Sequence, residues 1–122
     1  MTVTDHGGTS LAERFDAYVL GGVDRLKALG YNPALFLTMA ALPGGVVVAA
    51  RRLLAGPRRT SDGFRRLYEM GELGSSVEFA VCLPWFAPLF TDEEVDEARA
   101  RLVLHEFPLD RRLAATSTPG WA

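Results

Sequence analysis

The chain has 122 residues, of which 48% are hydrophobic, and its 13 basic and 15 acidic side chains give a net charge of −2. This length and hydrophobic content predict one domain with its own core. They exclude disordered, collagen-like and disulfide-stapled proteins. One cysteine and two histidines are too few for the usual closed zinc sites, so we expect no metal and no internal disulfide. The first ten residues lack the basic and apolar regions of a secretory signal, which predicts a cytoplasmic protein.

Helical start and stop signals recur along the chain, and no convincing strand pattern appears. The predicted fold class is therefore all-α, a single compact domain of five to six short helices. We expect residues 10–113 to form this domain, preceded by a flexible N-terminus at residues 1–9. Residues 114–122 are expected to be a flexible C-terminal tail unless Trp121 finds a pocket.

The first two helices are predicted from their capping residues. Ser10 and Glu13 have the spacing of a capping box, in which each side chain accepts a hydrogen bond from an orphan amide of the first turn. Apolar residues then recur at helical spacing until Gly30 ends the helix. The second helix is predicted to start at Asn32, whose side-chain oxygen would cap it, and to run to about Leu42 before a proline and two glycines.

The third and fourth helices flank a Gly-Pro turn. The third is predicted over about residues 46–54, and the fourth is predicted to begin after Thr60 or Ser61 and to end before Gly71. Its helical spacing points three side chains toward the core, namely Phe64, Leu67 and Tyr68.

The fifth helix is expected near Ser75, because Ser75 and Glu78 repeat the capping-box spacing, and it should bury Cys82. The connection that follows, residues 84–90, is unusually apolar for a loop. We therefore expect it to pack on the core rather than to extend into solvent.

The sixth helix begins with a third capping box, Thr91 with Glu94, and should end near Phe107. Together the helical stripes predict a core made of Phe15, Val19, Leu26, Leu35, Phe36, Leu53, Phe64, Leu67, Val77, Val81, Phe86, Phe90, Ala98 and Leu102.

Residues 31–50 contain no charged side chain, and twenty such residues have the length of a membrane span. A break at residues 42–45 divides this stretch, and each half has its own start and stop signals. Two short buried helices explain it better, so we expect no membrane partner.

The middle of the chain carries three segments in a familiar arrangement: GGVVVAARRLL (Gly44–Leu54), DGFRRLYEMGELGSSVEFAV (Asp62–Val81) and FAPLFTDEEVDEARARL (Phe86–Leu102). Over about residues 30–105 the chain resembles a small, widespread bacterial family of uncharacterised proteins. The resemblance implies an all-helical module and implies no activity or catalytic residue. The chain departs from that family's pattern at Tyr68, where tryptophan is more usual, and at Gly74, where a polar residue is.

Few residues qualify for catalysis. Glu69, Glu72 and Glu78 are close in sequence, but acid–base chemistry needs two carboxylates held across a cleft, and capping and solvation account for these three. Cys82 and His105 are the only thiol and imidazole pair, and the apolar neighbours of Cys82 favour a core role. His105 is expected at the surface near a helix C-terminus. We assign no catalytic residue and no cofactor, and we lean toward a protein that is not an enzyme.

Arginines are the best functional candidates, because residues 45–66 hold six of them against one acid. We call this set the arginine edge: Arg51, Arg52, Arg58, Arg59, Arg65 and Arg66. Residues 67–122 hold ten acids against four arginines. The edge could pair with these acids, within the molecule or across a dimer, or it could neutralise nucleic-acid phosphates. The net negative charge favours the first interpretation.

Trp85 and Phe86 lie in the apolar connection and could anchor an interface, line a ligand pocket or form a lid over the core. Burial favours the lid. The leading functional hypothesis is a non-enzymatic interaction module that binds a protein partner or itself through an arginine edge and an acidic face. The alternatives are a nucleic-acid-binding accessory protein that uses the arginine edge, and a small helical enzyme or carrier of a small-molecule ligand with an apolar pocket near Trp85.

Overall fold

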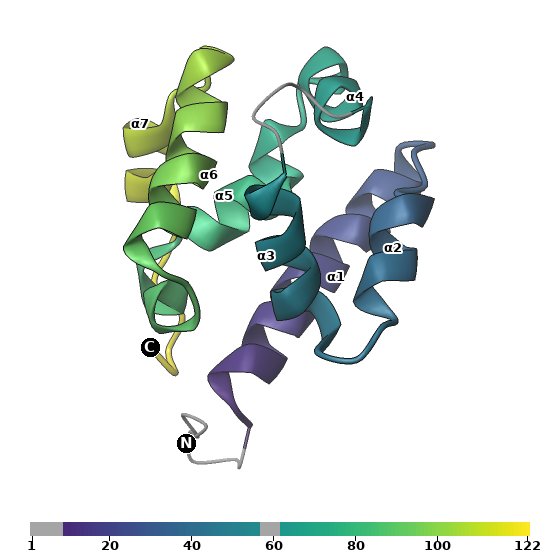
Figure 1. The fold of residues 1–122 in the computed structure, drawn as a ribbon. Helices are drawn as coiled ribbons and strands as arrows, with labels where there is room; N and C mark the ends of the chain where they lie inside the picture. The colour runs from purple at the N-terminus through teal and green to yellow at the C-terminus, as the bar shows by residue number, and fades with distance from the viewer. Residues whose placement is uncertain (1–8, 57–61) are drawn as a thin grey trace.

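The computed structural model describes residues 9–56 and 62–122. Within those two ranges the chain forms seven α-helices and two 3-10 helices and no β-strand (Figure 1), which confirms the predicted all-α fold. The predicted flexible N-terminus lies, apart from Thr9, outside the described residues, as do Thr60 and Ser61. The elements are, in chain order, α1 (Leu11–Ala28), α2 (Ala34–Ala40), α3 (Gly45–Ala55), α4 (Asp62–Met70), η1 (Leu73–Ser75), α5 (Val77–Cys82), η2 (Pro84–Leu89), α6 (Asp92–Leu104) and α7 (Leu109–Ala115).

Helix α1 begins at the predicted capping box. The backbone N of Glu13 donates to Ser10 Oγ at 3.1 Å, and the backbone N of Ser10 donates to Glu13 Oε1 at 3.3 Å. Gly30 follows the helix with a φ of 94°, a left-handed conformation that costs glycine no Cβ clash. Buried residues recur every three or four positions along one side of α1, namely Leu11, Phe15, Val19, Val23 and Leu26.

Helix α2 differs from the prediction in two ways. Pro33 takes the N-cap position and no side chain caps the helix, so the cap predicted at Asn32 is wrong. The helix buries none of its seven residues, and Leu35, expected in the core, is 78% exposed. The reason is tertiary: α2 packs mainly on α3 and directs Phe36 and Ala40 toward the core, so the neighbouring Leu35 faces solvent. In the described part of the chain no helix is both long enough and apolar enough to cross a membrane.

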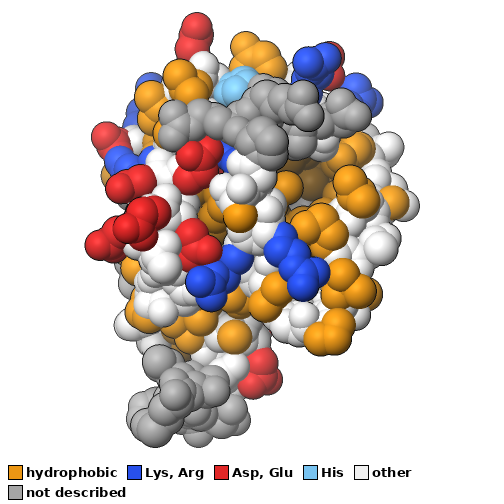
Figure 2. Space-filling model, viewed as in Figure 1, with side chains coloured by type: hydrophobic (Ala, Val, Ile, Leu, Met, Phe, Trp, Pro, Cys, Tyr) orange, Lys and Arg blue, Asp and Glu red, His pale blue; other side chains and the backbone are white. Residues whose placement is uncertain are grey.

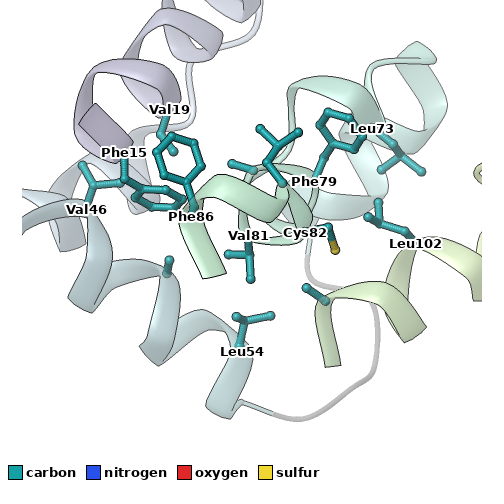
Figure 3. Close-up of a cluster of buried hydrophobic side chains, with 14 of the residues drawn as sticks. Phe15, Val19, Val46, Leu54, Leu73, Phe79, Val81, Cys82, Phe86 and Leu102 are labelled. Atoms are coloured by element: carbon teal, nitrogen blue, oxygen red, sulfur yellow. The ribbon is translucent and has the colours of Figure 1, made fainter. Parts of the chain in front are cut away.

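The core is built around α5 and η2. Helices α1, α3 and α6 each pack on α5, which places it at the centre of the fold. Phe86 of η2 is 1% exposed, and its ring meets that of Phe15 edge to face with the centroids 5.1 Å apart. The apolar connection therefore packs on the core as predicted, although as a 3-10 helix. Figure 3 shows the side chains that converge there, among them Val19, Val46, Leu54, Leu73, Phe79, Val81, Cys82 and Leu102.

Two local predictions in α4 and α5 are wrong. Tyr68, expected to face inward, is half exposed. Ser76, not Ser75, caps α5, because its hydroxyl accepts the backbone N–H of Phe79 at 3.1 Å. Glu78 therefore closes no capping box and is buried in the first turn of α5. The spacing rule selected the wrong one of two adjacent serines.

Helix α6 starts at the predicted capping box, but the short helix α7 after it was not predicted. Helix α7 carries Arg112, whose guanidinium lies against Gly74 of η1 so closely that a Cβ at that position would collide with it. A larger residue at position 74 would therefore require the flexible end of the Arg112 side chain to move.

The end of the chain returns to the core. The Trp121 ring lies 5.8 Å from the Phe86 ring, measured between centroids, and the Arg14 guanidinium carbon lies 4.8 Å from the centre of the Trp121 ring. A cation over a tryptophan face is attracted by the negative charge of the ring face. Trp121 thus packs against the core, the exception that the sequence prediction allowed for the tail.

Candidate interaction surface

The arginine edge divides between two helices. Arg51 and Arg52 are exposed on α3, and Arg65 and Arg66 are exposed on α4, whereas Arg58 and Arg59 lie outside the described residues. Helix α3 packs on α1, α2, α5 and α6, and α4 packs on η1. Among the described residues the arginines therefore stand on two helices that each pack elsewhere rather than on one tightly packed helix pair.

Arg51 has a partner within the molecule. Its Nε lies 2.8 Å from Glu94 Oε2, in the capping box of α6. Partial burial alone would raise the pKa of the Glu94 carboxyl, but the hydrogen bond from the backbone of Thr91 and the Arg51 guanidinium hold that pKa below its usual value. This contact agrees with the interpretation that the arginines pair with the acids of the C-terminal half.

Of the arginines in residues 9–56 and 62–122, the most deeply buried lies outside the predicted edge. Arg101 of α6 is 8% exposed and donates to the carbonyls of Leu53, Leu54 and Gly56 at 3.1, 3.3 and 3.2 Å. Its Nε also donates to Glu97 at 2.8 Å. The last carbonyls of a helix have no partner within the helix. Arg101 thus acts as a capping group for the C-terminal end of α3, supplied from a distant part of the sequence.

Glu78 is buried beside this arginine. Its Oε2 lies 3.8 Å from Arg101 Nη1, an ion pair that is too long for a hydrogen bond. Burial raises the pKa of the Glu78 carboxyl above its ordinary value, against the opposing effects of its own backbone amide, Arg101 and His105. The sequence predicted that Glu78 would cap a helix, and in the structure its carboxyl is instead a buried titratable group.

A pH titration of stability tests this burial. The folded-state pKa of Glu78 is raised above its ordinary value of 4.5, so the folded protein binds the proton more tightly than the unfolded chain does. The stabilisation from that proton is complete below the unfolded pKa and is lost as pH rises through the folded pKa. We therefore expect wild type to lose stability relative to Glu78→Gln as pH rises above about 4.5. Urea unfolding at a series of pH values measures this difference.

Glu72 provides the control with the opposite sign. Its pKa is lowered, chiefly by the hydrogen bond from Arg25 at 2.7 Å. Its contribution to stability is present above its ordinary pKa and is lost as pH falls through the folded pKa. The variant Glu72→Gln should thus be less stable than wild type at neutral pH, and this difference should disappear as pH falls. Parallel profiles for wild type and Glu78→Gln would contradict the burial of an ionisable carboxyl at position 78.

The face viewed in Figure 2 has three zones. Acidic side chains gather over α6, arginines lie at the centre over α3, and apolar side chains cover the region of α2. The acidic zone, which we call the acidic face, includes the exposed residues Asp92, Glu93 and Asp96. Helix α2 has no charged residue and buries none of its side chains. This uncharged helix, with Leu35 exposed on it, therefore lies beside the arginines of α3.

Trp85 and Phe86 are not part of this face. Phe86 is in the core, and Trp85 is half-buried with its ring centroid 6.4 Å from that of Phe86. The indole Nε1 of Trp85 is buried and has no hydrogen-bond partner among the described residues. The arrangement matches the lid over the core that burial favoured in the sequence.

Cys82 and His105 lack the properties of a nucleophilic thiol–imidazole pair. Cys82 is buried, and burial raises the pKa of its thiol to about 12. His105 caps the C-terminal end of α6, with Nδ1 2.8 Å from the Arg101 carbonyl oxygen and its ring against Phe64 at 4.8 Å. A nucleophilic cysteine needs an environment that favours the thiolate, and this cysteine has the reverse.

Thiol labelling tests the burial of Cys82. A pKa of about 12 against an ordinary 9.0 leaves about 1,000-fold less thiolate near neutral pH. We expect Ellman's reagent to label the native protein about 1,000-fold more slowly than the urea-unfolded chain at the same pH. Rapid stoichiometric labelling of the native protein would show that the thiol is accessible and would contradict this assignment.

No family model, no curated protein and no solved structure matches this chain. The resemblance described for residues 30–105 therefore depends on its residues alone.

Proposed function

We propose that the chain is a non-enzymatic helical interaction module that binds a protein surface through its arginine edge and acidic face, with α2 as the apolar part of the contact. The observation that carries the proposal is α2 itself, a helix without charge that buries none of its seven residues. Exposed apolar surface bordered by polar groups is the usual composition of a protein-binding site.

The partner we propose is a second copy of the chain, because the charges of one copy are complementary to those of another. The acidic face on α6 and the arginines on α3 lie next to each other, so a two-fold dimer can set the arginines of each copy against the acids of the other. Such rim charges orient a complex and increase its association rate, while apolar contact supplies most of the affinity.

Charge-swapped variants test this arrangement. We expect the wild-type chain to show a concentration-dependent dimer in sedimentation equilibrium that weakens at high salt. The variants Arg52→Glu with Arg65→Glu, and Glu93→Arg with Asp96→Arg, should each be monomeric when measured alone. An equimolar mixture of the two should recover a heterodimer, because one of its two symmetry-related contacts keeps the original charge pairs and the other restores them with reversed sign.

Two further variants make the test specific. Arg111→Glu on α7 makes one such charge reversal outside the arginine edge and should leave association unchanged. Leu35→Glu places a charge on the exposed side of α2 and should abolish association without unfolding the chain, since the wild-type side chain is 78% exposed. A chain that stays monomeric at every concentration and salt would refute self-association.

Nucleic-acid binding through the same arginines is the second candidate, favoured by the exposure of Arg52, Arg65 and Arg66. Arginines bind phosphate, and binding of this kind weakens steeply with salt. Fluorescence anisotropy with duplex DNA at low salt tests it, with Arg58→Glu and Arg59→Glu as the variant expected to lose binding. Absence of binding by the wild-type chain at low salt would remove this candidate.

A further inference from the structure

A cavity of about 90 Å³ lies between α1, α2, α4 and the segment that joins η1 to α5. It is distinct from the surface described above and is partly open to solvent. Most of its wall is apolar, and the lining residues used below are Val23, Leu26, Tyr31, Phe36, Gly63 and Glu78.

The cavity has a structural origin. Helix α2 packs mainly on α3, so Tyr31 and Phe36, half-buried beside α1, form an outer wall instead of filling the space. Gly63 on α4 lies next to the Tyr31 hydroxyl, from which an added Cβ would be only 3.2 Å away. Well-packed interiors leave few spaces larger than a water molecule, so an opening of this volume leaves room for a small guest.

Glu78 is the acidic residue among those that line the cavity, beside the hydroxyl-bearing Tyr31, Ser75 and Ser76. Its residue is 4% exposed, and it lines a cavity whose other walls are largely hydrocarbon. Arg101 does not hydrogen bond with it, since the described N–H groups of Arg101 donate to Glu97 and to three carbonyls of the α3 terminus, and the closest approach to Glu78 is 3.8 Å. A carboxylate offers about four acceptor sites, so Glu78 can accept hydrogen bonds from a guest.

We propose that this cavity binds a small aliphatic or aromatic amine, with the ammonium group on the Glu78 carboxylate and the hydrocarbon body against Val23, Leu26 and Phe36. Hydrogen bonds between charged groups are the strongest that side chains make, and they strengthen away from water. A negatively charged ligand fits poorly, because it would face the same carboxylate. Binding sites of this type combine an apolar pocket with a few placed polar groups.

Three probes of the same shape test the proposal. Isobutylamine, isobutanol and isobutyrate differ in the charge of the head group, and amide chemical shifts in ¹H–¹⁵N spectra locate each one on the full-length chain. We expect the amine to shift the amides of the lining residues, the alcohol to bind at least about tenfold more weakly, and the acid not to bind.

Two variants test the head-group contact and the cavity volume separately. Glu78→Gln should weaken binding of the amine by about tenfold or more, and Gly63→Leu, which fills the opening and leaves Glu78 in place, should abolish it even if the first variant folds poorly. Leu35→Ala on the exposed side of α2 is the matched control and should leave amine binding unchanged.

Three results would overturn the proposal. The first is the absence of any shift with the amine at saturating concentration. The second is equal binding of the amine and the alcohol, which would exclude Glu78 as the head-group partner. The third is a set of shifts confined to the acidic face on α6, which would show surface attraction of a cation instead of a cavity site.

Discussion

Replacing Arg101 with alanine is expected to lower the free energy of unfolding by about 3–5 kcal/mol, because it leaves a buried carboxylate without its cation. Glu78 would be that carboxylate, 3.8 Å from the guanidinium in the wild-type chain. The same substitution removes the donors of three carbonyls at the end of α3, and unsatisfied buried acceptors carry their own penalty. Since small domains have about 5–15 kcal/mol of stability in total, the loss would be a large fraction of it.

Urea unfolding of a set of α6 and α5 variants measures this effect. Arg99→Ala on the same helix removes an exposed ion pair with Asp110 at 3.0 Å and should change stability by no more than about 1 kcal/mol. Arg101→Lys keeps the charge but loses the planar fork, so an intermediate loss is expected. Adding Glu78→Gln to Arg101→Ala should restore part of the stability, because the orphaned charge is gone. Equal losses for Arg99→Ala and Arg101→Ala would contradict the assigned role.

The second large effect is expected at Phe86. Phe86→Ala should lower the free energy of unfolding by about 3–5 kcal/mol, the usual range for removing a buried aromatic ring. The Phe86 ring lies within 5.1 to 5.9 Å of the rings of Phe15, Trp121 and Tyr18, measured between centroids. Its removal would leave a cavity at the junction of α1, η2 and the C-terminal tail.

Tryptophan fluorescence gives a second measurement for this variant. Trp121 and Trp85 both stand against the Phe86 ring, so emission should shift toward that of exposed indole at a lower urea concentration than in wild type. Leu35→Ala is the matched control, since its side chain is mostly exposed, and it should change stability by less than about 0.5 kcal/mol. A Phe86→Ala protein as stable as this control would show that η2 is not part of the core.

Much of the local structure could be predicted from the sequence, because capping acts over three residues. The boxes at Ser10 and Thr91 are present with both hydrogen bonds. The amphipathic stripe of α1 identified Phe15 and Val19 as core residues, and the apolar neighbours of Cys82 predicted its burial. The all-α fold follows from these signals, since each depends only on neighbouring residues and on helical periodicity.

The candidate sites were less accessible to sequence reasoning. Arg51 was identified as part of a charged edge, and its pairing with Glu94 spans 43 positions. Arg101 and Glu78 were missed as a pair, since no local spacing links residues on α6 and α5. The signal available in the sequence was weak: an arginine within a helix whose neighbours, Ala98 and Leu102, follow a buried stripe.

Local signals were sufficient to predict the helical fold class, the starts of α1 and α6 and the apolar side of α1, because capping and the helical repeat act between near neighbours in the chain. Which apolar sides find a partner depends on contacts between distant segments. The tertiary structure left Leu35 in solvent and buried Glu78 beside Arg101, because burial and charge pairing depend on which helices meet across long stretches of sequence.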